Sequence, residues 1–293
     1  MARGDTKAAD VIVLGAGGMF GHVAAAVLRR TYAVVATARR EMPDCIAYDA
    51  DEPDDALASI AQRARPQALI VNAIAATAAQ MRAAAGTQQR AFAVNATFPH
   101  RLARVAADQN QRVIHLSTDA VFPPDCGTVS EDDAIGPQDT YGRSKVAGEL
   151  TDAHCLTIRC SIVGPPPPQR RSGLWSWVAD QARGATVSGY VNQLWAGMTT
   201  QQLAAVCVAL VDPERFAKAR TAGPVHHLAP NPTISKFDLV RALAALLRPD
   251  VTVRPADAAQ PISRILVSRH RVLDALAPRW PTWPETLAAA SRN

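Results

Sequence analysis

The chain has 293 residues, of which 48% are hydrophobic and 19% charged. This composition excludes a largely disordered chain, and no apolar run approaches the roughly 18 residues of a membrane span. The net charge is +5, and only four of the 31 basic residues are lysines. Because no basic run is interleaved with aromatic residues, the charge does not indicate a nucleic-acid-binding protein.

Short apolar runs alternate with amphipathic stretches through the first half of the chain. The pattern predicts strands at 11–14, 33–38, 68–72, 113–116 and 156–159, and helices at 18–30, 57–65, 90–109 and 141–151. Strands and helices that alternate at this spacing are typical of βαβ units. The sequence therefore predicts an α/β fold with a Rossmann-type, doubly wound parallel sheet.

Four prolines at 165–168 interrupt this regularity, because they can continue neither a helix nor a strand. We expect residues 8–164 to form a dinucleotide-binding domain. Residues 165–293 should form mainly a smaller, mixed α/β substrate domain, from which roughly 186–212 return to the first. Further helices are predicted at 174–181, 201–211 and 236–247.

Five cysteines without a CxxC pair indicate reduced thiols rather than disulfides or a metal site. Residues 1–10 are polar, and the apolar run that follows is too short for a signal peptide. The sequence therefore predicts a cytoplasmic protein with no metal site and no membrane association.

A glycine-rich loop directly follows the first predicted strand and opens a helix. Glycines in such a loop allow the backbone to approach a pyrophosphate, which is then stabilised by the helix N-terminus. We predict that this loop binds a dinucleotide through Gly15, Gly18, Met19, Phe20 and Gly21.

The second predicted strand ends at the position that reads the adenosine ribose. A carboxylate there would bind the 2′-hydroxyl of NAD, whereas this chain places Arg39 and Arg40. A guanidinium pairs with a 2′-phosphate, so the sequence favours NADP(H) over NAD(H). Asp49, after a third strand segment, is a candidate contact to the adenine edge.

Tyr141 and Lys145 are spaced i, i+4 on one face of a predicted helix. A free phenol has a pKa of about 10, which a neighbouring ammonium lowers towards the range useful for proton transfer. The same ammonium can hold a nicotinamide ribose. The pair therefore predicts a catalytic acid and its tuning residue.

Hydroxyl and carboxyl side chains end the strand at 113–116, at the edge of the sheet where ligands bind. Ser117 and Thr118 can hydrogen-bond a substrate carbonyl beside the phenol, and Asp119 follows them. We interpret His115 as a core histidine. His226 and His227 face opposite ways on a strand and do not indicate a metal site.

These motifs together resemble the extended short-chain dehydrogenase/reductases, of which the GxxGxxG spacing is typical. Within them, the chain is most similar to the dTDP-4-dehydrorhamnose reductase group over about residues 11–283. The resemblance rests on the glycine loop, Asn72-Ala73-Ile74-Ala75, Asn95, Ser117-Thr118-Asp119, and the Tyr141/Lys145 pair.

The resemblance implies that Thr118 holds a sugar ketone, Tyr141 donates the proton, and Lys145 tunes Tyr141 and binds the ribose of NADPH. It implies reduction of a keto group, at C4, on a nucleotide-linked deoxysugar in polysaccharide or deoxysugar biosynthesis, and a homodimer is common in the group. Cofactor contacts would include Asn72, Ala73, Ile74, Ala75, Asn95, Ser117, Tyr141 and Lys145. Candidate substrate contacts are Asp119, Ala120, Val121, Ser161 and Trp195, although core packing is the default interpretation of Trp195.

The chain also departs from the group's pattern. Ala120 stands where related dehydratases carry a catalytic Glu, which argues against dehydration. Ala76 replaces a usual aromatic residue, and acidic residues that normally follow are missing from 77–82. A nucleotide-sugar epimerase that retains its cofactor, or a non-catalytic NADP-binding regulatory subunit, therefore remains an alternative to a reductase.

Overall fold

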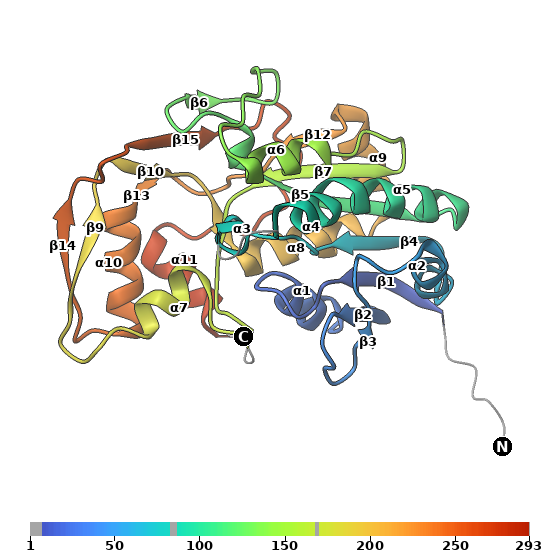
Figure 1. Cartoon of the computed structure of the whole chain (residues 1–293), viewed down its shortest axis with the longest axis horizontal. Helices are drawn as coiled ribbons and strands as arrows, with labels where there is room; N and C mark the ends of the chain where they lie inside the picture. Colours follow the sequence, from blue (N-terminus) through green and yellow to red (C-terminus); the bar gives the residue numbers. More distant parts are fainter. Residues whose placement is uncertain (1–7, 83–86, 168–169, 293) are drawn as a thin grey trace.

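The computed structural model describes residues 8–82, 87–167 and 170–292 and is built around a seven-stranded sheet (Figure 1). Every neighbouring pair of strands runs parallel, in the order β12-β7-β5-β4-β1-β2-β3. The strands are β1 (Ala9–Leu14), β2 (Val34–Ala38), β3 (Ile46–Ala47), β4 (Ala64–Asn72), β5 (Arg112–Thr118), β7 (Cys155–Cys160) and β12 (Val225–His227).

The strand order reverses between β1 and β4, as it does in a Rossmann-type sheet. Val11 to Leu14 in β1 are at most 1% exposed, because apolar layers cover both faces of this central strand. Ligands bind such sheets at the carboxyl ends of the strands, beside the point of reversal. The predicted fold class is confirmed, and the reversal directs attention to the ends of β1, β4 and β5.

Helices cover both faces of the large sheet. One face packs against α1 (Gly21–Leu28), α8 (Thr200–Leu210) and α9 (Pro213–Ala222). The other packs against α2 (Asp54–Ala61) and α5 (Phe98–Asp108). A further helix, α6 (Thr140–Ala147), lies beside β5 near its carboxyl end.

The long helix expected at 90–109 is interrupted. The structure has α4 (Thr87–Phe92), a π-helical segment η1 (Ala93–Thr97), and then α5, with the short α3 (Ala78–Arg82) before them. Single π-helical turns within α-helices occur often at functional sites. Here the wider turn contains Asn95, whose side chain is fully buried.

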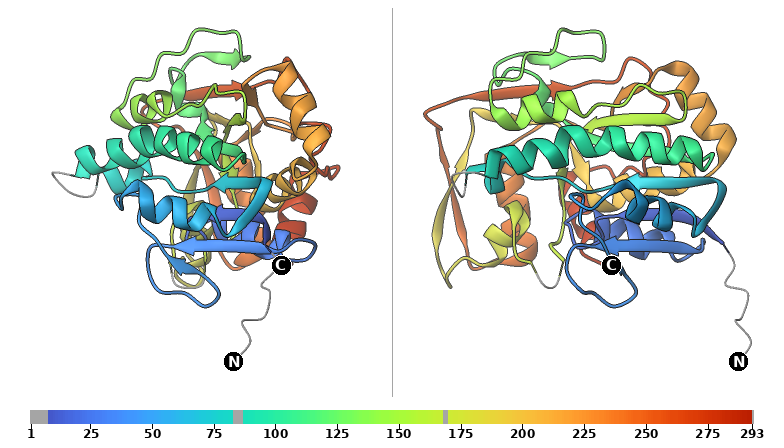
Figure 2. Two further views of the ribbon diagram at one scale, coloured as in Figure 1. Left: turned by 90° about the vertical axis from the view of Figure 1, so that its right-hand side faces the viewer. Right: turned by 45° about the vertical axis from the view of Figure 1, so that its right-hand side comes forward.

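A smaller region lies beside the carboxyl ends of the large sheet (Figures 1 and 2). Its four-stranded sheet has the order β13-β10-β15-β6, and two strand pairs, β11-β8 and β14-β9, accompany it. These strands are β6 (Gly127–Val129), β8 (Ile162–Val163), β9 (Thr186–Tyr190), β10 (Gln193–Trp195), β11 (Met198–Thr199), β13 (Ile234–Ser235), β14 (Thr252–Ala256) and β15 (Ile262–Leu266). A separate apolar core gathers around α7 (Gly173–Ala179), α10 (Lys236–Leu247) and α11 (Trp283–Ala290).

The chain passes more than once between the two regions. Of the segment 186–212, β9 pairs with β14 in the smaller region, whereas α8 packs against α1 on the large sheet. The later strand β12 also joins the large sheet beside β7. Of the proline run at 165–168, Pro168 lies outside the described residues. Among the residues that are described, no helix is both long and apolar enough to cross a membrane.

Candidate functional site

The end of β5 places Thr118 beside a short 3₁₀ turn, η2 (Asp119–Val121). The Thr118 hydroxyl accepts a hydrogen bond from the Ala120 amide at 3.2 Å and donates one to an Asp119 carboxylate oxygen at 3.0 Å. These bonds fix the hydroxyl at the carboxyl edge of the sheet. This is the position that the sequence predicted for it.

Helix α6 brings Tyr141 to the same edge. Its N-cap, Asp139, accepts a 2.6 Å hydrogen bond from the Gly142 amide. A Cβ at Gly142 would overlap the carbonyl oxygen of Ala120, so glycine is required for α6 to lie directly against η2. The close approach brings the side chains of Tyr141 and Thr118 near enough to interact.

The Tyr141 phenol is held in its protonated form. Burial raises the pKa of Tyr141 to about 12, while its interaction with Thr118 lowers it and the charge of Asp119 raises it further. The sequence predicted a pKa lowered by the neighbouring Lys145 ammonium, so the direction of the shift is opposite to the expected one, because burial dominates. A phenol with this pKa is neutral near pH 7 and carries the proton that a reduction needs.

Lys145 lies one turn after Tyr141 but points towards the sheet. Its side chain is 2% exposed, and its Nζ lies 3.4 Å from Nε2 of His115. Burial lowers the pKa of Lys145 to about 8, against the raising effects of Glu149 and Cys160. His115, interpreted from the sequence as a core residue, is buried as expected and also contacts the predicted tuning residue.

Asn95 links three parts of the site. Its side-chain oxygen accepts a hydrogen bond from the Ala76 amide at 2.8 Å, and its Nδ2 donates to the Ala76 carbonyl at 2.9 Å. The same Nδ2 donates to the Ser144 hydroxyl of α6 at 3.0 Å. The π-helical turn therefore fastens the loop after β4 to the helix that carries Tyr141.

We expect Asn95→Ala to lower the free energy of unfolding by about 1–3 kcal/mol, because it leaves buried backbone groups without partners. It should also weaken binding of the nicotinamide cofactor, since the loop after β4 loses its attachment. Denaturant unfolding and cofactor titration measure the two effects. Asn192→Ala is the matched control, because Asn192 makes the same pair of bonds to Ala258 outside the site. Equal loss of cofactor affinity in both variants would contradict a local role for Asn95.

Ser117 faces away from the position expected for a cofactor contact. Its hydroxyl donates a 2.7 Å hydrogen bond to Glu149, which also receives two hydrogen bonds from Arg159 at 2.8 and 2.7 Å. The side chains of Arg159 and Glu149 are 7% and 9% exposed. This buried ion pair connects the end of β7 to the end of α6. The hydrogen bond from Ser117 attaches the end of β5 to the same pair, which is a structural role.

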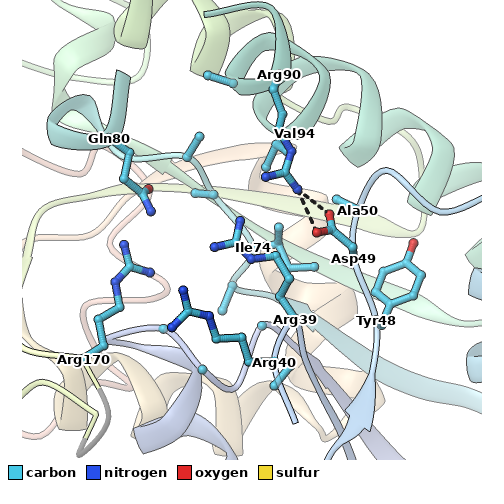
Figure 3. Close-up of a pocket in the computed structure, with 18 of the residues that line it drawn as sticks. Arg39, Arg40, Tyr48, Asp49, Ala50, Ile74, Gln80, Arg90, Val94 and Arg170 are labelled. Carbon is cyan, nitrogen blue, oxygen red and sulfur yellow. Dashed lines mark hydrogen bonds and ion pairs between the residues drawn. The ribbon is translucent and has the colours of Figure 1, made fainter. Parts of the chain in front are cut away.

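A cavity of about 610 Å³ opens at the carboxyl ends of β1, β2, β3 and β4 (Figure 3). At its floor, Gly15 has a φ of +88°, and a Cβ there would lie 3.0 Å from Ile74. Glycine therefore allows the turn and leaves the wall open. The predicted cofactor residues that line the cavity are Gly15, Gly18, Arg39, Arg40, Asp49, Ala73, Ile74 and Ala75.

Positive side chains surround this cavity. Arg39 and Arg40 extend into it from the end of β2, and Arg170 extends from the opposite side (Figure 3). Asp49 also lines it, but its carboxylate is paired with Arg90 by hydrogen bonds of 2.8 and 2.7 Å. The arrangement fits a ligand with several phosphates, and the sequence reasoning did not identify Arg90 or Arg170.

The other predicted cofactor residues do not line the cavity; they are Met19, Phe20, Gly21, Asn72, Asn95, Ser117, Tyr141 and Lys145. The Phe20 side chain packs in the core between α1 and the sheet. Gly21 lies so close to the Gly15 carbonyl that any Cβ would overlap it, which makes its role structural.

The smaller region contributes two cations near Asp119. Arg264 of β15 and Lys236 of α10 both act on the Asp119 carboxyl, whose pKa is nevertheless raised because burial dominates. The Arg264 Nε is buried and has no hydrogen-bond partner among the described residues. Two cations of this kind fit an anionic substrate on the side of Tyr141 that faces the smaller region.

The remaining predicted substrate residues are largely enclosed. Trp195 is 5% exposed, stacks near Trp283 with ring centroids 5.1 Å apart, and donates a 2.7 Å hydrogen bond to Ser161. The structure shows core packing, which is the default interpretation of Trp195 from the sequence. Ala120 and Val121 are 8% and 0% exposed, so their side chains pack against the protein interior.

Comparisons with known proteins agree with this geometry. Residues 9–277 match the family described as the RmlD substrate binding domain. A dTDP-4-dehydrorhamnose reductase of Mycobacterium tuberculosis is 29% identical over 313 residues, covering 97% of this chain and 93% of that protein.

Solved structures share the fold at lower identity. A dTDP-4-dehydrorhamnose reductase from Bacillus anthracis in complex with NADP has a TM-score of 0.76 at 20% identity, covering 96% of this chain and 98% of that one. MoeE5 in complex with UDP-glucose and NAD has a TM-score of 0.70 at 22% identity, covering 96% and 97%. The expected class, an NAD(P)-dependent oxidoreductase of the short-chain dehydrogenase/reductase type, is confirmed. By sequence and by fold, this chain belongs to the RmlD substrate binding domain family.

Proposed function

We propose that the protein reduces a keto group, at C4, on a nucleotide-linked deoxysugar with NADPH, as a cytoplasmic step of polysaccharide or deoxysugar biosynthesis. The observation that carries this proposal is the protonated Tyr141 phenol beside the Thr118 hydroxyl at the carboxyl edge of a Rossmann-type sheet. The relatives named dTDP-4-dehydrorhamnose reductase support the substrate class.

The residues present fit a phosphorylated dinucleotide. The cavity beside Gly15 is open because no side chain fills it, and Arg39 and Arg40 extend into its far end. These two guanidinium groups would hold the 2′-phosphate, and the loop from Ala73 to Ala75 would lie along the nicotinamide half. When bound, NADPH supplies a hydride to the carbonyl carbon.

Tyr141 and Thr118 supply the proton side of the reaction. Thr118 would turn its hydroxyl from Asp119 to the substrate carbonyl oxygen and orient it beside the phenol. Tyr141 then transfers its proton to that oxygen as negative charge develops there, and the phenol becomes a phenolate. We expect an ammonium on Lys145 to stabilise the phenolate that forms. Without a nearby positive charge, the phenol would be a weak proton donor near neutral pH.

The substrate would occupy the side that faces the smaller region. Lys236 and Arg264 would pair with its diphosphate, because the Arg264 Nε is buried without a partner. Lys236 also lies 5.3 Å from the centre of the Trp195 ring, which orients its amine. Ala120 offers no carboxylate for dehydration, so the proposed reaction ends with the alcohol.

We expect the double variant Arg39→Ala with Arg40→Ala to raise the KM for NADPH by roughly 10- to 100-fold. A hydrogen bond to a charged group contributes about 1.5–3 kcal/mol to binding. Because NADH has no 2′-phosphate, its KM should change little. Steady-state kinetics with both cofactors measure the change. Arg183→Ala, at an exposed position, is the control. An equal rise in the KM for NADH would contradict a 2′-phosphate site.

The proposed function is tested by following NADPH oxidation with a panel of 4-keto nucleotide sugars. The proposal predicts stoichiometric oxidation with at least one of them. Isomerisation without net oxidation would indicate an epimerase. Binding of NADPH without turnover on any sugar would indicate a regulatory subunit.

A further inference from the structure

Asn72, His115 and Lys145 form a chain of three buried polar side chains that joins β4, β5 and α6. Asn72 and His115 are direct neighbours across the β4–β5 pair, and Asn72 Nδ2 lies 3.1 Å from His115 Nδ1. On the other side of the ring, His115 Nε2 lies 3.4 Å from Lys145 Nζ. All three side chains are at most 2% exposed, so water does not compete for these contacts.

A backbone amide fixes the orientation of the Asn72 side-chain amide. Its Oδ1 accepts a hydrogen bond from the Ile74 backbone amide at 3.1 Å. The NH₂ group of Asn72 therefore faces His115. A turned amide would place this NH₂ against the Ile74 N–H and leave two donors facing each other.

This orientation determines the tautomer of His115. Because Asn72 donates to Nδ1, that nitrogen is unprotonated, and the proton of the neutral ring lies on Nε2. The Nε2–H then points at Lys145. A neutral amine accepts this hydrogen bond, whereas an ammonium would set donor against donor.

We propose that His115 is a positioning residue that disfavours the ammonium form of Lys145 in the free protein, and that Asn72 and the Ile74 amide hold it in the tautomer required. Ile74 lines the large cavity, so the charge of Lys145 is coupled to the wall of that cavity.

Two titratable groups oppose the effect of burial on Lys145. Burial lowers the pKa of Lys145 to about 8, whereas Glu149 and Cys160 of β7 raise it. The Cys160 thiol is itself protonated near neutral pH, because burial raises its pKa to about 12. The pKa of His115 is held well below its usual range by burial, by Lys145 and by His100. A neutral His115 across the physiological range is consistent with the proposed tautomer.

The scarcity of lysine allows a direct test on the free protein. With only four lysines, ¹³C labelling at Cε gives four titration curves by NMR. In the unmodified protein, we expect Lys145 to titrate below the other three. In His115→Gln the amide can turn its carbonyl oxygen to Lys145, so its midpoint should rise by roughly one pH unit.

His226→Gln is the matched control, because His226 is equally buried in the same sheet, and its hydrogen bonds among the described residues go to the carbonyls of Ala219 and Gly223 rather than to a lysine. It should leave the Lys145 curve unchanged. An unchanged curve in His115→Gln, or the same rise in both variants, would overturn the proposal.

A second measurement needs no variant. The ¹⁵N shifts of the His115 ring, assigned through its own backbone resonances, should show a protonated Nε2 and a bare Nδ1 at neutral pH. A proton on Nδ1, or on both nitrogens, would overturn the proposal. Both measurements use the free protein and stand apart from turnover. Only the expected shift of the alkaline limb of NADPH oxidation in His115→Gln rests on the proposed function.

Discussion

Tyr141→Phe is expected to lower kcat by roughly 10²- to 10⁴-fold, the usual contribution of a positioned general acid. The substitution removes one oxygen atom and its proton from the edge of the sheet. NADPH affinity should change little, because Tyr141 does not line the large cavity. Steady-state turnover and cofactor titration on the same preparation separate the two quantities.

Tyr190→Phe is the control for this substitution, because Tyr190 is 40% exposed on β9. It should retain full activity. Full activity in Tyr141→Phe would contradict the assignment of the proton donor. Loss of NADPH binding together with turnover would show that the variant disturbs the fold of the site rather than its chemistry.

Arg159→Met is expected to lower the free energy of unfolding by about 3–5 kcal/mol. Removing the guanidinium leaves the buried carboxylate of Glu149 with only Ser117 as a partner at this position. Methionine restores much of the buried volume, so the decrease in the free energy of unfolding measures mainly the cost of the unpaired carboxylate. Chemical denaturation followed by two probes gives the midpoint and the slope.

Arg241→Met is the matched control, because its ion pair with Asp238 is 65% and 43% exposed. Exposed pairs contribute at most about 1 kcal/mol, so the control should unfold close to the unmodified protein. Similar losses in the two variants would contradict the importance of burial for the Arg159–Glu149 pair.

The chemistry at the strand ends was predictable because local sequence determines it. A strand followed by glycines predicts a tight strand–helix turn whatever surrounds it. The spacing of Tyr141 and Lys145 likewise predicts one helical face without any knowledge of distant contacts. The structure places Thr118 and Tyr141 in contact for this reason. The arginines after β2 reached the cavity for the same reason, since a strand end leads directly to the ribose position.

The contacts that could not be predicted connect residues far apart in sequence. The apolar period from 90 to 109 is continuous, and only the bonds from Asn95 to Ala76 and Ser144 reveal why the helix widens at 93–97. His115 has the burial of a core residue, and its role depends on Asn72, 43 positions away. Lys236 and Arg264 reach Asp119 only because the smaller region folds back against the sheet.

Transfer of deuterium from NADPH that carries deuterium at both hydrogen positions of the nicotinamide C4 tests the central claim most directly. The labelled cofactor is incubated with a 4-keto nucleotide sugar, and the product is analysed by NMR and mass spectrometry. We predict one deuterium at C4 of the sugar alcohol for each NADPH oxidised. An unlabelled isomer of the substrate with no NADPH oxidised, or no product from any sugar of the panel, would contradict it.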